Sequence, residues 1–108
     1  MSPAARHRAM LRDRSIAALR AGLAGVAPDA RVLLFGSLAR GDFDGASDAD
    51  LLVISDARPD WSLDAALGRA VDMLHWTPAQ WQRALADGHP FAQDVTREGI
   101  ILWPPESA

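Results

Sequence analysis

The chain has 108 residues, a formal net charge of −3 and 49% hydrophobic residues, a balance typical of a globular protein. This length suffices for one hydrophobic core, so we expect a single domain over residues 1–108. No apolar run approaches about 18 residues and the Arg-rich start lacks a signal segment, which predicts a cytoplasmic protein with no membrane segment. The negative charge argues against direct nucleic-acid binding. Without cysteine or lysine, thiolate chemistry and a lysyl-nucleotide intermediate are excluded.

The first half of the chain is expected to contain a helix, a strand and a tight turn. Four apolar residues recur at helical spacing, and the helix should end near residues 25–28: Ile16, Leu19, Leu23 and Val26. Residues 31–35 are a short apolar strand. Gly36 then permits a tight exit, and Ser37 is expected to be the N-cap of a short helix that runs through Arg40.

The second half of the sequence is expected to contain three more strands and three more helices. A polar loop at 41–47 leads into a strand at 48–54, followed by a helix at 63–69 and a strand at 71–76. Pro78 and Pro90 each open a helix, the first reaching about Asp87 and the second about Glu98. Residues 100–103 form a last short strand. We therefore expect an α+β fold, a mixed sheet of about three to four strands with helices on one face.

Two acidic residues stand at the start of the apolar strand at 48–54. Side chains alternate along a strand, so Asp48 and Asp50 project from one face, about 7 Å apart. Two carboxylates so placed repel each other unless a cation lies between them. An acid inside an apolar strand is also costly without a partner or a metal. Together with the turn at Gly36 and Ser37, this pattern predicts a site for a metal-bound triphosphate, whereas the turn alone would predict nothing.

The string Gly36-Ser37, ten further residues and then Asp48-Ala49-Asp50 resembles the nucleotidyltransferases of the DNA polymerase beta superfamily. The similarity is greatest to the minimal nucleotidyltransferases, which are often the antitoxin halves of HEPN/MNT toxin–antitoxin pairs. A looser similarity extends from about Arg31 to Trp103. The resemblance implies a small polymerase-beta-like fold.

The resemblance also implies site residues and cofactors. Asp48 and Asp50 would hold Mg²⁺, and ATP would be the donor, with its triphosphate at Gly36 and Ser37. Such sites use a third carboxylate that binds metal and activates the attacking hydroxyl. Asp72 is the candidate, because one face of its strand carries Asp72, Leu74 and Trp76 and would align with the first acids if the two strands are neighbours.

Arg40 has two equally good interpretations. The short helix that follows Gly36 and Ser37 would bring its guanidinium to the phosphates of a nucleotide. A surface salt bridge to Asp42 or Asp44 is the alternative.

Three functions fit these observations. The first is Mg²⁺-dependent transfer of AMP from ATP to a hydroxyl of a partner protein, an antitoxin that inactivates a HEPN-type RNase toxin within a hetero-oligomer. Tyrosine is the expected target, and it must belong to the partner because this chain has none. The second is an antitoxin that neutralises its partner by contact alone. The third is a small-molecule, antibiotic-modifying nucleotidyltransferase, ranked last because such enzymes carry an additional helical domain.

Overall fold

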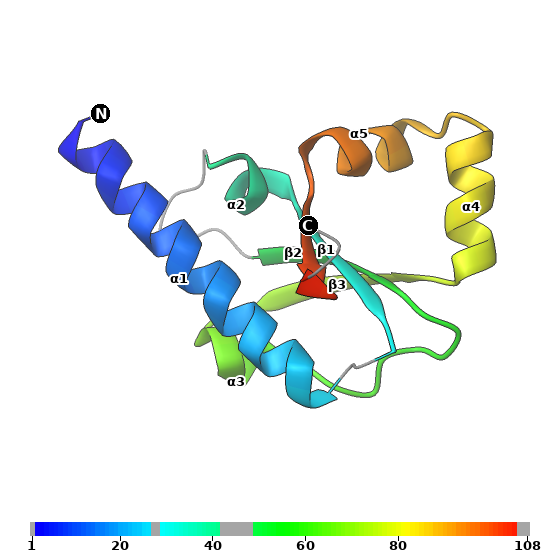
Figure 1. The fold of residues 1–108 in the computed structure, drawn as a ribbon, viewed down its shortest axis with the longest axis horizontal. Helices are drawn as coiled ribbons and strands as arrows, with labels where there is room; N and C mark the ends of the chain where they lie inside the picture. Colours follow the sequence, from blue (N-terminus) through cyan, green and yellow to red (C-terminus); the bar gives the residue numbers. More distant parts are fainter. Residues whose placement is uncertain (1, 27–28, 42–48, 106–108) are drawn as a thin grey trace.

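The computed structural model describes residues 2–26, 29–41 and 49–105. Helices and strands alternate along most of this part of the chain (Figure 1). In chain order the elements are α1 (Pro3–Val26), β1 (Arg31–Phe35), α2 (Gly36–Arg40), β2 (Ala49–Ile54), α3 (Asp64–Leu67), β3 (Val71–Trp76), α4 (Pro78–Ala86), α5 (Pro90–Glu98) and β4 (Ile100–Trp103). The predicted strands at 31–35, 71–76 and 100–103 are confirmed.

The four described strands form one mixed sheet in the order β3-β2-β1-β4. Strand β1 pairs antiparallel with β2 and with β4, whereas β2 and β3 are parallel. The parallel pair needs a crossover connection, and α3 lies in it. The predicted α+β class and mixed sheet are thus confirmed, with β3 at one edge.

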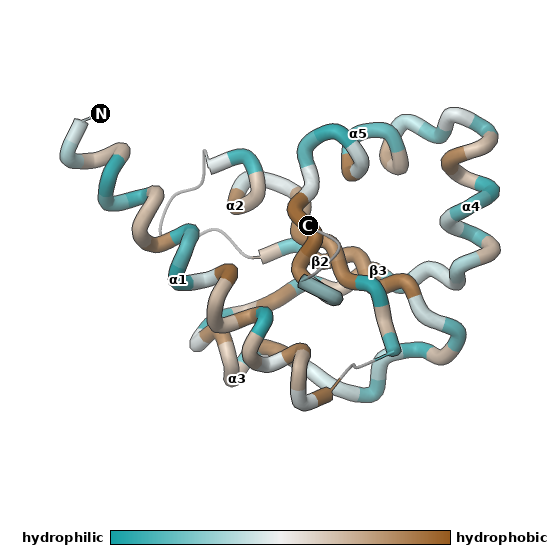
Figure 2. The backbone as a smooth tube through the Cα atoms, in the orientation of Figure 1, coloured by the Kyte–Doolittle hydropathy of each residue, from teal (hydrophilic) through white to brown (hydrophobic). Residues whose placement is uncertain are grey.

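Helices cover both faces of this sheet, so the prediction of helices on one face is wrong. Residues of α1 and α2 pack with Val32, Leu34 and Leu51 in one cluster. Residues of α4 and α5 pack with Leu33 and Leu52 in a second cluster. The physical reason is that the central strands β1 and β2 are apolar on both faces, as their brown colour in Figure 2 shows, and each face has to be buried.

Local differences from the expected helices have simple causes. Helix α1 begins at Pro3, well before the apolar stripe, and only its second half is buried in the core. Helix α3 ends at Leu67 because Gly68 adopts a left-handed φ of +79° and caps it. Helix α4 begins at Pro78 as expected, and the preceding residue caps it: the Thr77 hydroxyl accepts from the Gln80 N–H, and the Gln80 side chain accepts from the Thr77 N–H.

Two arginines of α1 tie the helix to the sheet and to α2. The Arg12 guanidinium donates to the carbonyls of Leu38 and Ala39, at 3.2 and 2.9 Å. The Arg20 guanidinium donates to the carbonyls of Leu102 and Ile101, at 3.3 and 2.9 Å. These charged donors add hydrogen bonds to carbonyls of α2 and of the edge strand β4. Helix α1 therefore holds α2 as well as the far edge of the sheet.

The substitution Arg20→Met keeps the apolar stem of this side chain and removes both of its hydrogen bonds to β4. We expect the free energy of unfolding in urea to fall by about 1–3 kcal/mol, the range for hydrogen bonds from charged groups. Arg14→Met, at an exposed position of the same helix, is the control and should change little. Equal stability of the two variants would contradict this account of α1.

Candidate active site

The acids Asp50 and Asp72 lie directly opposite each other on neighbouring parallel strands. In a parallel ladder, paired residues point to the same face, and neighbouring strands are about 4.8 Å apart. The alignment predicted for the strand that carries Asp72 is therefore confirmed. Asp50 is half-buried and Asp72 is exposed, so the pair opens toward solvent at the β3 edge.

The face that carries the two acids becomes apolar toward the C-terminal ends of β2 and β3. Beyond Asp50 the same face of β2 continues with Leu52 and Ile54, and these pack against Trp81 and Ala84 of α4. Helices α4 and α5 thus seal the C-terminal ends of β2 and β3, whereas Asp72 at the opposite end stays exposed. The acids stand at the open end of an otherwise apolar face.

The turn after β1 lies against the Asp50 carboxylate. Phe35 is the ladder partner of Asp50, and Gly36 follows with a φ of +79°. A Cβ atom built on Gly36 would come within 2.5 Å of the Asp50 Oδ2 atom. Only glycine satisfies both the backbone conformation and this close approach. The turn therefore fixes where the carboxylate can lie.

Ser37 is inside the short helix and not at its N-cap, so that prediction is wrong. Helix α2 already begins at Gly36, its N-cap residue is Phe35, and no side chain caps it. The positive φ of Gly36 lets the chain turn directly from β1 into the helix, which leaves no capping position for Ser37. Ser37 is half-buried and directly follows Gly36, whose backbone lies against the Asp50 carboxylate.

Asp48 lies outside the described residues, as do Asp42 and Asp44, the alternative partners proposed for Arg40. Within the described ranges, no group of three or more His, Asp or Glu residues is gathered as a metal site. Two carboxylates on one face nevertheless supply the hard oxygen ligands that Mg²⁺ prefers. Asp50 and Asp72 therefore fit the expected metal, with Asp48 as the predicted further ligand.

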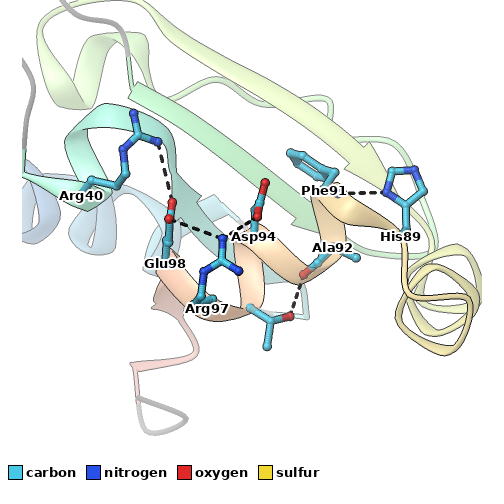
Figure 3. A network of polar contacts seen from close by, with 8 residues as sticks. Arg40, His89, Phe91, Ala92, Asp94, Arg97 and Glu98 are labelled. Carbon is cyan, nitrogen blue, oxygen red and sulfur yellow. Dashed lines mark hydrogen bonds and ion pairs between the residues drawn. The ribbon is translucent and has the colours of Figure 1, made fainter.

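Arg40 forms an ion pair with an acid other than the two expected ones. Its guanidinium lies 3.9 Å from the Glu98 carboxylate at the end of α5, and both side chains are partly exposed. Arg97 in turn contacts Asp94 at 2.7 Å and Glu98 at 3.7 Å (Figure 3). No local pattern could have revealed this pairing, because it joins two helices that are nearly sixty positions apart.

A pocket of about 200 Å³ lies beside the turn, between α2 and α5. Phe35, Gly36 and Arg40 line one side, and Phe91 with Glu98 line the other. The rings of Phe35 and Phe91 meet edge to face at a centroid distance of 5.1 Å, which fixes α5 against β1. Arg40 is thus presented next to Gly36, at the same turn that contacts Asp50.

Comparison with protein-family models matches residues 18–92 to a family described as nucleotidyltransferase domain. The matched range contains β1, the turn at Gly36, β2 and β3, and the small α+β architecture agrees with such a fold. Searches of the curated proteins and of the solved structures found no match. None of the helices in the described part of the chain is long and apolar enough to span a membrane.

Gly36→Ala and Gly41→Ala form a matched pair that isolates the contact with Asp50. Both glycines have a left-handed φ, but a Cβ at Gly41 meets nothing within 4 Å. Each variant should lose about 1–2 kcal/mol of unfolding free energy from the backbone strain. Only Gly36→Ala should displace the Asp50 carboxylate and shift its ¹³C resonance. An unchanged Asp50 resonance in Gly36→Ala would contradict the geometry.

Proposed function

The chain belongs to the nucleotidyltransferase domain family, and from this premise we propose that it transfers AMP from ATP, with Mg²⁺, to a hydroxyl of a partner protein. One observation carries the proposal. Asp50 and Asp72 are register partners on one open face of the sheet, beside the turn at Gly36. Family membership supports nucleotidyl transfer in general, whereas the donor, the metal and the acceptor are the proposed part.

Asp50 and Asp72, with Asp48, would hold the metal. When bound, Mg²⁺ supplies positive charge to the phosphate oxygens of the donor. The acceptor oxygen forms a bond to the α-phosphorus, the bond from that phosphorus to the bridging oxygen breaks, and pyrophosphate leaves with the electron pair. Asp72 takes the hydroxyl proton, since it is the more exposed of the two acids.

Arg40 and the turn would bind the triphosphate. The guanidinium stands beside Gly36 in the pocket between α2 and α5, where it complements phosphate charge. Glu98 holds this side chain from the far side of the pocket. An exposed ion pair of this kind contributes little stability, so Glu98 competes only weakly with a phosphate for this guanidinium.

A protein acceptor fits the openness of the site. Asp72 is exposed and lies on the strand at the edge of the described sheet, where a large acceptor can reach it. The chain has no tyrosine of its own to modify. We propose a HEPN-type RNase toxin as the partner, bound in a hetero-oligomer in the cytoplasm and inactivated at a tyrosine; the resemblance of the Gly-Ser and Asp-x-Asp pattern supports this choice.

Removing one carboxylate should separate binding from chemistry. Asp50→Asn should weaken Mg²⁺-dependent ATP binding at least about tenfold, measured by calorimetry, because a metal ligand is lost. Asp72→Asn should retain more of the binding and lower kcat by about 10²–10⁴-fold, as expected for a general base. Asp13→Asn, an exposed acid of α1, is the control for the change in charge. Full turnover by Asp72→Asn would exclude Asp72 as the base.

Mass spectrometry distinguishes a modifying enzyme from an antitoxin that acts by contact. We expect the protein encoded next to this chain's gene to gain about 329 Da per transferred AMP in the presence of ATP and Mg²⁺. Its inhibition should persist after this chain is removed. Inhibition that requires continued stoichiometric contact, with no mass change and no effect of Asp50→Asn, would establish the contact mechanism instead.

A further inference from the structure

We propose that an extended segment of the acceptor protein pairs antiparallel with the edge of β3 and so presents its hydroxyl to Asp72. The proposal rests on the proposed function, because it concerns how a protein acceptor reaches the same acids. Strand β3 is at the edge of the described sheet, and it carries Asp72 itself. The docking edge is therefore continuous with the candidate active site.

The backbone of β3 has hydrogen-bonding groups that face away from the sheet. The Ser55 N–H donates to the Trp76 carbonyl at 3.2 Å, so Trp76 points its backbone groups toward the β2 side. Orientation alternates along a strand, so Asp72 and Leu74 face β2, whereas Met73 and His75 face outward. Val71 has the outward parity as well, and its N–H donates to the Asp64 carboxylate at 3.0 Å. Met73 and His75 thus offer donors and acceptors to an added strand.

A groove accompanies these outward groups. Arg58 and Pro59 stand opposite Met73, Leu74 and His75, and together they line a pocket of about 330 Å³. The His75 ring is held in place by a 2.9 Å hydrogen bond between Nε2 and the Ser55 carbonyl. Strand addition combines main-chain hydrogen bonds with pockets for alternate side chains, and this edge provides both.

Antiparallel pairing at this edge would set the acceptor hydroxyl beside the acids. Because Asp72 and Leu74 face β2, they would stand in non-hydrogen-bonded pairs with the added strand, where Cα atoms approach to about 4.5 Å. The acceptor residue opposite Asp72 then points to the same face as Asp50 and Asp72. Its oxygen bonds to the α-phosphorus, its proton passes to Asp72, and pyrophosphate leaves.

The same register specifies the neighbours of the acceptor residue. Leu74 is 41% exposed on the face of Asp72, and in an antiparallel segment it lies opposite the residue two positions before the hydroxyl. An apolar residue at that position would cover Leu74. Val71 lies opposite the residue after the hydroxyl, and the Asp64 carboxylate already accepts from its N–H, so the main-chain pairing ends at this position.

One acid lies at this edge next to the position of the acceptor hydroxyl. The exposed Asp64 carboxylate accepts from the outward-facing Val71 N–H at 3.0 Å. A lysine or arginine immediately after the hydroxyl residue would lie near Asp64 and complement this charge. The acceptor segment is therefore expected to have an apolar residue two positions before the hydroxyl residue and a basic residue directly after it.

A positional library of synthetic peptides tests this inference, with ATP and Mg²⁺ as co-substrates and AMP addition as the readout. Each peptide carries one tyrosine, serine or threonine within an otherwise varied segment. We expect selection of apolar residues two positions before the hydroxyl and of basic residues after it. Leu74→Lys should reduce kcat/KM for the apolar peptides roughly tenfold and shift the preference at that position to acidic residues. Leu85→Lys, on α4 and 37% exposed, is the control and should change neither.

The remaining outcomes separate this inference from the proposed function. Peptides modified without a preference at these positions, or equally well by Leu74→Lys, would overturn edge pairing. So would a library that stays unmodified while Mg²⁺-dependent ATP binding is intact. A dimer in analytical ultracentrifugation that Leu74→Lys dissociates would assign the edge to a second copy of this chain and overturn it too. Loss of ATP binding in the parent chain would instead refute the proposed function.

Discussion

The parallel pairing of β2 with β3 is the constraint on which the site depends, because it forces two carboxylates to the same end and face of the sheet. Two like charges on neighbouring strands repel each other, and water weakens this repulsion at the exposed Asp72. The remainder of the same face offsets this repulsion. Leu52 and Ile54 are buried there against α4 and α5. The fold thus places two carboxylates side by side, an arrangement that suits a divalent cation.

The helices position the site around Asp50 and Asp72 in different ways. Helix α1 fixes α2 through the Arg12 guanidinium, and α2 begins at the turn that touches Asp50. Helix α5 is held by the contact of Phe91 with Phe35, and it sets Glu98 opposite Arg40 (Figure 3). Elements from the beginning and from the end of the chain therefore meet at one turn. Open access to Asp72 remains at the β3 edge, where no described helix lies over the acid.

Much of this arrangement is accessible from local sequence patterns. The alternation in residues 71–76 indicated a strand whose Asp72 shares a face with Leu74 and Trp76, and the register with β2 agrees. Proline positions marked the starts of α4 and α5, because proline suits a first helical turn.

Other features depend on contacts that local patterns do not encode. The helices on both sheet faces follow from the burial of β1 and β2 together, which the pattern of a single strand does not show. The start of α2 at Gly36 follows from a positive φ that displaces Ser37 from the capping position. The pairing of Arg40 with Glu98 requires α5 to return to the turn, which is a property of the whole chain path. Asp48 lies outside the described residues, so its place beside the other acids remains a prediction.

Paramagnetic broadening by Mn²⁺ in ¹⁵N NMR spectra, with a non-hydrolysable ATP analogue present, tests the central claim most directly. If Asp50 and Asp72 jointly hold a divalent cation, their amide signals should broaden before those of Ile54 and Trp76 at the other ends of the same strands. Excess Mg²⁺ should restore them, and the Asp50→Asn/Asp72→Asn double variant should lose the effect. Broadening centred elsewhere, or undiminished in that double variant, would contradict a metal-binding carboxylate pair.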